Sequence, residues 1–470
     1  MKKLLILLLI LWSFPGIAQM DSAKVYKKRV LESTEIDFLT SYYWQDGDNA
    51  SVTGGIGTEE LTDFTSTIIV SVPLNDDDVL TIDAGISAYS SASSSNVNPF
   101  SGGGDDDGGN NGALTAVSPW YESSGASGGD LWINFVASYT HNSDDRNKIW
   151  SANASFATEY DYTSFGFGGS YTRLFNEKNT EIGIKGNVYL DTWGPQYPIE
   201  LRRYDGDLNS GYFGDTDILD QDGNAIDKNG TEVWNPANYQ PIVDEKRNTF
   251  SLSLSFSQIL TRNLQISLFS DIILQDGWLA NPMQRVYFSD VNNYYIGNPQ
   301  SIPVYESPEN TDVFQLSDDI ERLPTSRLKI PIGARLNYFI NEFLVLRTYY
   351  RYYSDDWGIK SHTANLELPV KISNRFTITP SYRYYTQTEA DYFAPYNQHL
   401  SSSEFYTSDY DLSEFDANQY GLAIRYTDIF TKFHIRKFGL KSVDLKYSLY
   451  QRSTGLDAGI ITAGFKFVMD

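Results

Sequence analysis

Hydrophobic and polar residues alternate with a period of two along most of this chain. In the segment 250–257, Phe250, Leu252, Leu254 and Phe256 are each followed by a serine. Only an extended strand places two such sets of side chains on opposite faces. The alternation recurs in segments of about 11 to 14 residues, which we interpret as 16 strands starting near residues 34, 61, 78, 130, 147, 162, 179, 247, 263, 327, 342, 360, 374, 418, 440 and 457.

The predicted strands are long for a globular protein. Globular strands usually have about 5 to 6 residues, whereas tilted strands that cross a membrane need about 9 to 11. Beyond the first eighteen residues, no segment approaches the roughly 18 consecutive apolar residues that a transmembrane helix requires. We therefore predict an all-β fold, a transmembrane antiparallel up-and-down β-barrel of about 16 strands.

The lengths of the connections support a barrel. Every long connection follows an odd-numbered strand: 46–60, 91–129, 193–246, 276–326 and 388–417. The connections after even-numbered strands are short. Outer-membrane barrels have long loops outside the cell and tight turns in the periplasm. The parity therefore predicts long extracellular loops and two termini in the periplasm.

The beginning of the chain is typical of an exported protein. Met1-Lys2-Lys3 is basic, Leu4–Trp12 is apolar, and Gly16-Ile17-Ala18 places small residues before Gln19. This pattern predicts a signal peptide over 1–18 that is cleaved after export. We expect a periplasmic arm over 19–33, the barrel over 34–470, and localisation in the bacterial outer membrane with its lipid as the surroundings.

The composition excludes several classes of protein. The chain has 60 acidic and 36 basic residues, a net charge of −24, and no cysteine. Nucleic-acid binding needs a cationic face, so we expect no nucleic-acid partner. Without cysteine there are no disulfides, no thiolate metal sites and no lipidated cysteine. The five long loops together carry a net charge of −28, so the rest of the chain without its signal peptide is close to neutral.

The polar face of the predicted strands is basic in the C-terminal half. With the apolar face turned to lipid, the polar face must line the interior. The inward positions include Glu367 and Asp444, and a larger basic set: Lys329, Arg335, Arg347, Arg351, Lys371, Arg375, Arg383, Arg425 and Lys446. A basic lumen favours anionic solutes. Alternatively, these side chains pair with loop carboxylates that fold into the bore and plug it.

One loop contains closely spaced acidic residues that suggest calcium. The candidate ligands are Asp215, Asp217, Asp220, Asp222, Asn224 and Asp227. Calcium takes six to eight oxygen ligands, usually with a glycine that turns the loop. Gly223 comes too early for an EF-hand, and no glutamate closes the ring, so solvated acidic turns are the alternative. Calcium is the one cofactor that the sequence suggests.

The sequence offers little for catalysis. The four histidines are His141, His362, His399 and His434, and none has the spacing of a zinc site or lies beside a nucleophile elbow. His362, on the apolar face of its strand beside several serines, is the single candidate for a surface Ser-His pair. Its alternative is a residue near the membrane interface at the end of its strand. We expect no enzyme activity.

Several motifs resemble those of a known family. Gln45-Asp46-Gly47-Asp48-Asn49, followed by Thr53-Gly54-Gly55-Ile56-Gly57-Thr58-Glu59-Glu60-Leu61, is similar to the first loop of the exported family known as domain of unknown function 3570. The segments 351–359, 383–387 and 408–410 are also similar. The resemblance implies an outer-membrane barrel of Gram-negative bacteria without an assigned activity. Genes beside such families suggest an envelope system for redox chemistry or metal handling.

Three functions are compatible with these observations. The first is a channel or transport barrel whose basic lumen passes or captures small anionic or metal-complexed solutes. The second is a closed barrel that serves as a scaffold for periplasmic or surface lipoproteins. The third and weakest is a surface enzyme.

Overall fold

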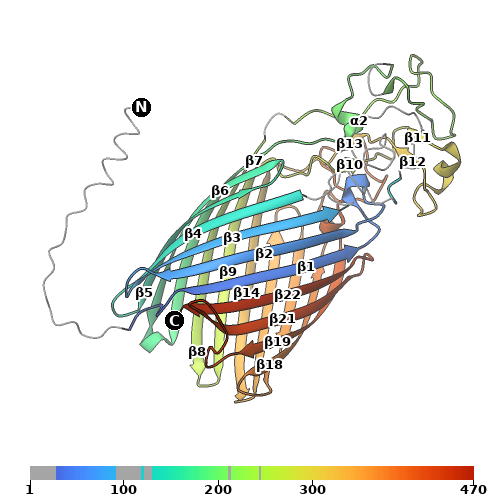
Figure 1. Cartoon of the computed structure of the whole chain (residues 1–470). Helices are drawn as coiled ribbons and strands as arrows, with labels where there is room; N and C mark the ends of the chain where they lie inside the picture. Colours follow the sequence, from blue (N-terminus) through green and yellow to red (C-terminus); the bar gives the residue numbers. More distant parts are fainter. Residues whose placement is uncertain (1–27, 92–117, 121–129, 210–212, 243–244, 470) are drawn as a thin grey trace, which may run out of the picture.

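The fold is a closed antiparallel β-barrel, as the sequence predicts (Figure 1). The computed structural model describes residues 28–91, 118–120, 130–209, 213–242 and 245–469. The predicted signal peptide, most of the predicted arm and the glycine-rich part of the second loop lie outside the described residues. Within the described chain, sixteen long strands form the wall.

The bounds of the strands lie close to the predicted ones. The sixteen strands are β1 (Glu35–Asp46), β2 (Leu61–Pro73), β3 (Asp78–Ser91), β4 (Asp130–Asn142), β5 (Lys148–Thr158), β6 (Tyr162–Phe175), β7 (Thr180–Trp193), β8 (Lys246–Thr261), β9 (Leu264–Gly277), β14 (Ser326–Asn341), β15 (Leu344–Asp355), β16 (Lys360–Glu367), β18 (Phe376–Gln387), β19 (Phe415–Thr427), β21 (Phe438–Arg452) and β22 (Asp457–Met469). Two short strands belong to the same sheet: β17 (Val370–Lys371) pairs with β15 and β18, and β20 (His434–Ile435) pairs with β21.

The barrel closes between its first and last strands. Each strand pairs antiparallel with its neighbour along the chain, and β22 pairs back to β1 from Glu35 with Val468 to Asp46 with Asp457. Closure satisfies the backbone N–H and C=O groups that an open edge would leave unpaired. A wall of this kind can cross a membrane because its strands supply one another's hydrogen bonds.

The two faces of the wall differ as the alternation predicts. Large apolar side chains are exposed on the outer face; in β8, for example, Leu252 is 40% and Leu254 is 48% exposed. The intervening positions, such as Ser251, Ser253 and Ser255, are polar and face the bore. Apolar side chains exposed over many neighbouring strands are unfavourable in water and match a lipid environment.

All five long connections leave the same end of the barrel, which we call the loop end. The opposite end, here called the turn end, carries only short connections, such as Arg262 and Asn263 between β8 and β9. This separation follows the predicted parity. In the described part of the chain, no helix is both long enough and apolar enough to cross a bilayer.

Loops at the loop end fold together into a compact unit, here called the loop cap (Figure 1). It contains α2 (Ile199–Arg202) and two small two-stranded sheets, in which β10 (Arg285–Val286) pairs with β13 (Asp319–Ile320) and β11 (Tyr295–Gly297) pairs with β12 (Val313–Gln315). Its 3-10 helices are η1 (Ser51–Thr53), η4 (Pro299–Val304) and η5 (Tyr410–Leu412). Trp234, Phe314 and Ile296 lie in its largest apolar cluster.

The glycines of the first-loop motif allow that loop to pack against other loops. Gly54 and Gly57 have φ angles of +82° and +94°, which L side chains rarely adopt. A Cβ atom on Gly57 would lie 2.1 Å from the carbonyl oxygen of Pro119, and one on Gly54 would lie 2.6 Å from the Tyr287 ring. The motif therefore provides backbone that can approach the second and fourth long loops closely.

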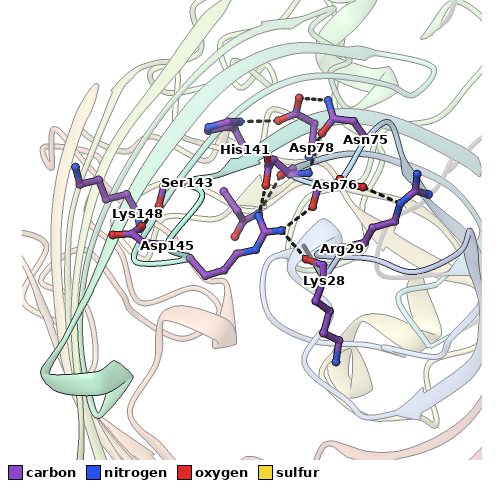
Figure 2. A network of polar contacts seen from close by, with 12 residues as sticks. Lys28, Arg29, Asn75, Asp76, Asp78, His141, Ser143, Asp145 and Lys148 are labelled. Atoms are coloured by element: carbon purple, nitrogen blue, oxygen red, sulfur yellow. Dashed lines mark hydrogen bonds and ion pairs between the residues drawn. The ribbon is translucent and has the colours of Figure 1, made fainter. Parts of the chain in front are cut away.

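At the turn end, the chain before β1 is held by polar contacts (Figure 2). The Arg146 guanidinium donates to the backbone oxygens of Lys28, at 2.7 Å, and Asp76, at 2.8 Å, and it pairs with the Asp77 carboxylate. The Arg29 guanidinium pairs with the Asp76 carboxylate at 2.9 Å. The described part of the predicted arm is thus attached to the turns after β2 and β4.

Candidate functional site

The predicted basic residues lie along the bore, with one difference. Eight of the nine are on the inward-facing register of β14, β15, β17, β18, β19 and β21: Lys329, Arg335, Arg347, Arg351, Lys371, Arg383, Arg425 and Lys446. Arg375 precedes β18 and lies in a turn at the turn end, where its backbone oxygen accepts from Thr427. That hydrogen bond continues the pairing of β18 with β19, so Arg375 lies one residue outside β18, at the turn end of the wall.

The opposite part of the wall is lined by small uncharged side chains. From β4 to β8, the inward positions carry mostly serine, asparagine and glycine: Asn134, Ser138, Ser151, Asn153, Ser155, Gly166, Gly168, Ser170, Asn187, Ser251, Ser253, Ser255 and Ser257. Hydroxyl and amide groups thus predominate on this side of the bore. The same inward register also carries charged residues: Asp63 of β2, Asp83 of β3, and Glu181, Lys185 and Asp191 of β7.

Some of the inward cations are neutralised by inward carboxylates. Arg425 forms an ion pair with Asp444, and Arg347 lies 4.0 Å from the Glu367 carboxylate. Nearer the turn end, the Lys466 amine contacts Glu35 at 2.6 Å and Asp37 at 3.4 Å. The alternative prediction is that these cations pair with loop carboxylates that plug the bore. In the pairs named here, the carboxylates come from the wall and not from the loops.

Other inward cations have no acidic partner. Among the described residues, no carboxylate lies within 4 Å of six of them: Lys329, Arg335, Arg351, Lys371, Arg383 and Lys446. Arg335 lies against two stacked rings, with its guanidinium 5.5 Å from the centres of Phe269 and Tyr349. Six of the eight inward cations thus lack an ion-pair partner in the described part of the wall.

The loop cap meets the inward-facing ends of strands. Gln45 at the end of β1 donates to the backbone oxygen of Glu59 at 2.8 Å, and Gln387 at the end of β18 donates to that of Asp411 at 3.0 Å. Arg452, at the end of β21, pairs with the Asp411 carboxylate at 2.8 Å. These side chains share the register of the bore, so the first and fifth long loops lie over its mouth.

A fully buried ion pair holds the loop cap together. The Arg285 guanidinium donates to the Glu200 carboxylate at 2.8 and 3.1 Å, and both side chains are 0% exposed. Arg285 also donates to the backbone oxygen of Val52, and Ser317 donates to Glu200 at 3.0 Å. This cluster joins the first, third and fourth long loops. Buried charges persist only when partners of this kind satisfy them.

Several carboxyl groups of the loop cap are buried without a full counter-charge. Burial raises the pKa of Glu59 to about 7 and that of Asp318 to about 7, because a dry environment disfavours the charged form. Burial, reinforced by the neighbouring Asp409, raises the pKa of Glu321 to about 8. Burial and the charge of Asp411 raise the pKa of Asp409 to about 6. The loop cap therefore holds protons near neutral pH.

The candidate calcium residues lie in a loop in which the carboxylates accept hydrogen bonds from nearby backbone N–H groups. The Asp220 carboxylate accepts hydrogen bonds from the backbone N–H groups of Asp222, at 2.9 Å, and Asn224, at 2.8 Å. Asp227 accepts from Asn229 in the same way. In the described residues, no group of three or more His, Asp or Glu side chains is arranged to hold a metal ion. Calcium binding by this segment stays a prediction.

His362 lies on the outer face of β16, on the apolar register, as predicted. Its Nδ1 atom is 2.7 Å from the Tyr350 hydroxyl, and its ring lies 5.2 Å from that of Tyr352. The neighbouring Ser361 and Thr363 point to the other face of the strand. The contacts of His362 are thus those of an aromatic cluster on the outer surface, and among the described residues none joins it to a serine hydroxyl.

The sequence reasoning missed the buried residues of the loop cap. Arg285, Glu200 and Glu321 come from loops without periodicity, and nothing in their neighbourhood distinguishes them from solvated charges. Arg452 was also missed, although the alternation of β21 places it on the inward face. The inward register of β21 is the sequence feature that could have indicated Arg452.

The chain resembles known barrels in fold at very low sequence identity. A bacterial polysaccharide outer membrane secretin is 9% identical, with 94% of this chain and 100% of that chain covered and a TM-score of 0.42. The TodX monoaromatic hydrocarbon channel, as its deltaS2 mutant, is 9% identical, with 93% and 90% covered and a TM-score of 0.38. The outer membrane protein OpdK from Pseudomonas aeruginosa is 8% identical, with 93% and 99% covered and a TM-score of 0.36.

The family comparison is more specific. No curated protein matches the chain. The model of the family described as "Protein of unknown function (DUF3570)" matches residues 9–440, which is most of the chain. The chain therefore belongs to this family, and the resemblance of the loop motifs is confirmed.

Proposed function

Starting from membership of a family without an assigned function, we propose that this protein is an outer-membrane channel or transport barrel. Its basic bore would pass or capture small anionic or metal-complexed solutes. The observation that carries the proposal is the set of six inward cations without acidic partners, on the side of the bore opposite strands in which hydroxyl and amide groups predominate. A low-dielectric wall strengthens the field of such groups, and the field raises the local concentration of anions.

We propose the outer membrane as the location of the protein because the outer surface of the wall is apolar. A closed barrel with an apolar outer face satisfies its backbone internally and presents side chains that suit lipid. The basic start of the chain and its short apolar segment support export through a cleaved signal peptide.

Conductance of the full-length protein in planar bilayers tests this proposal. Under a potassium chloride gradient, we expect a reversal potential that indicates preference for the anion. Arg335→Gln and Arg351→Gln should each lower that preference, because each removes one uncompensated cation from the bore. Arg173→Gln is the matched control, since Arg173 is exposed on the outer face and stacks on Phe175. Cation preference, or no conductance at all, would contradict the proposal.

A closed scaffold for lipoproteins is the second candidate, and the loop cap favours it. The first and fifth long loops contact inward-facing strand ends at the mouth, and the buried Arg285–Glu200 pair fixes the loops that surround them. A scaffold would use that rigid surface, or the turn end, to hold periplasmic or surface lipoproteins. Affinity purification from crosslinked outer membranes tests it; recovery of the barrel alone would count against a scaffold.

A further inference from the structure

A cluster of donors on the bore wall lies beside the stacked Phe269 and Tyr349 rings. From it, we infer that Arg335, Arg351 and Thr363 form a binding subsite for one small oxyanion, a carboxylate or a phosphate. This inference rests on the proposed function, because it names the chemical class of solute that the basic bore would hold.

The strand register places the three side chains next to one another. Arg335 of β14 lies opposite Tyr349 of β15, and Arg351 follows Tyr349 by two residues on the same inward face. Such diagonal neighbours in an antiparallel pair are about 7 to 8 Å apart at their Cα atoms, which long side chains span easily. Thr363 of β16 lies directly opposite Arg351. Two guanidinium groups and one hydroxyl therefore share one patch of the wall.

Two of these groups have hydrogen-bonding atoms without a partner. The Nε atom of Arg351 and the Oγ1 atom of Thr363 are both buried and make no hydrogen bond in the described structure. Thr363 is only 4% exposed. Buried polar atoms without partners are rare and destabilising, so such a pair indicates that something else satisfies them. The Arg351 N–H is a donor and the Thr363 hydroxyl can donate or accept, so an acceptor within reach of both atoms would satisfy both.

The neighbouring carboxylates do not supply that acceptor. Asp355, on the same strand as Arg351, accepts two hydrogen bonds from Arg327 and one from Tyr353. Glu367, on the same strand as Thr363, lies beside Arg347. The remaining inward-facing acids, among them Asp271 and Asp444, lie on other strands, and Asp444 pairs with Arg425. Among the described residues, no carboxylate forms an ion pair with Arg335 or Arg351. An oxyanion from solution would fill the gap that the wall leaves.

The Arg335 side chain is already ordered for this role. The Phe269 and Tyr349 rings are stacked, with centroids 5.6 Å apart and an interplanar angle of 14°, and the guanidinium lies 5.5 Å from each centroid. A side chain that is held in place before binding loses less conformational entropy when the ligand arrives. The planar guanidinium fork matches two oxygens of a carboxylate or phosphate, whereas chloride offers no such pair.

Calorimetric titration of the purified full-length protein in detergent tests the inference. Inorganic phosphate and acetate are titrated separately at constant ionic strength with chloride as the background anion. We expect one site per barrel for at least one of the two, and the arm that binds identifies the class. Arg351→Gln should weaken binding about tenfold or more, the loss of roughly one charge-assisted hydrogen bond.

Thr363→Val provides a second variant that is safe for folding. It keeps the shape of the side chain and removes a hydroxyl without a protein partner, so its melting temperature without ligand should be unchanged or higher. Binding should nevertheless weaken about threefold to tenfold, since a hydroxyl donor is lost. Arg173→Gln on the outer face should leave binding unchanged. Equal weakening in Arg173→Gln and Arg351→Gln would overturn the inference, as would normal binding in folded Thr363→Val.

The two proposals can fail separately. A barrel that conducts anions selectively but binds neither phosphate nor acetate would overturn the subsite and leave the channel. A barrel that binds phosphate or acetate at this patch but carries no current would support the subsite and overturn the channel.

Discussion

The barrel wall and the loop cap use the same kinds of residue in opposite ways. On the wall, Leu252 is 40% and Phe167 is 55% exposed, whereas Trp234 and Phe314 in the loop cap are 1% and 0% exposed. The exposure of charged side chains also differs between the two regions. Arg383 on the wall is exposed to the bore, whereas Arg285 in the loop cap is fully buried. The difference indicates that the two regions fold against different surroundings. The wall suits lipid outside and water inside, and the loop cap has an interior like that of a small soluble domain.

The largest effect is expected from a substitution that destabilises the loop cap and leaves the barrel wall unchanged. Glu200→Gln leaves the Arg285 guanidinium buried without its counter-charge, which should destabilise the loop cap by about 3 to 5 kcal/mol. Limited proteolysis should then cut the loops at 193–246 and 276–326 while the barrel stays folded in detergent.

The matched control for that change lies in the bore. Glu367→Gln removes the same charge from a partly exposed pair and should cost less than about 1 kcal/mol. Joint replacement of Glu200 by Leu and Arg285 by Met should restore much of the resistance to proteolysis, because neither residue then carries a buried charge. Unchanged proteolysis of Glu200→Gln would show that the pair does not hold the loop cap.

The second effect tests the two faces of the wall. Leu252→Arg places a charge on the outer face near the middle of β8, which should destabilise the barrel in lipid by about 2 to 4 kcal/mol. Ser253→Arg, one residue further along, faces the bore and should change the stability far less. Denaturant unfolding in vesicles measures both. Similar losses in the two variants would mean that the faces are assigned incorrectly.

The smallest of the three effects is a pH dependence confined to the loop cap. Burial raises the pKa of Glu321 from an ordinary 4.5 to about 8 and that of Asp318 from 3.8 to about 7. The folded loop cap thus keeps protons that the opened loops release. The contribution of these two groups to its stability is fully present below about pH 4 and is lost as the pH rises through 7 to 8.

Hydrogen exchange, corrected for the intrinsic rate, measures this dependence. Between pH 5 and pH 8.5, opening of the loops at 281–321 should increase at least tenfold, because one unit of pKa difference already corresponds to a factor of ten and both pKa values are raised by more than one unit. Glu321→Gln should remove much of the increase, whereas Glu309→Gln, an exposed change in the same loop, should not. A loop cap that becomes tighter at high pH would contradict the assignment.

The sequence could predict the wall because each strand carries its own evidence. The alternation in 250–257 needs no knowledge of any other strand, and the predicted starts at 61, 78 and 162 coincide with the observed ones. The largest displacement, three residues, is at β19, whose predicted start at 418 follows the observed one at Phe415. There the strand emerges directly from the loop cap, and Phe415 packs on Arg452.

The loop cap and the candidate subsite could be predicted only in part. Which side chains face the bore follows from the alternation, so the sequence alone predicts the inward positions of Arg335 and Arg351. Their lack of acidic partners depends on the register between neighbouring strands, which places Glu367 beside Arg347. The Arg285–Glu200 contact joins residues 85 positions apart in loops without periodicity, so no local pattern indicates it.

The seam between β1 and β22 affects how the protein reaches its native state. Its ladder pairs residues more than 400 positions apart, such as Glu35 with Val468, so it joins contacts of the largest sequence separation in the sheet. Contacts of this kind form late, after a large loss of chain entropy. Until β22 pairs with β1, the backbone groups at the edges of these two strands stay unpaired and can pair with other polypeptides. We therefore expect the chain to need protection of both edges, for example by a chaperone, until the barrel closes.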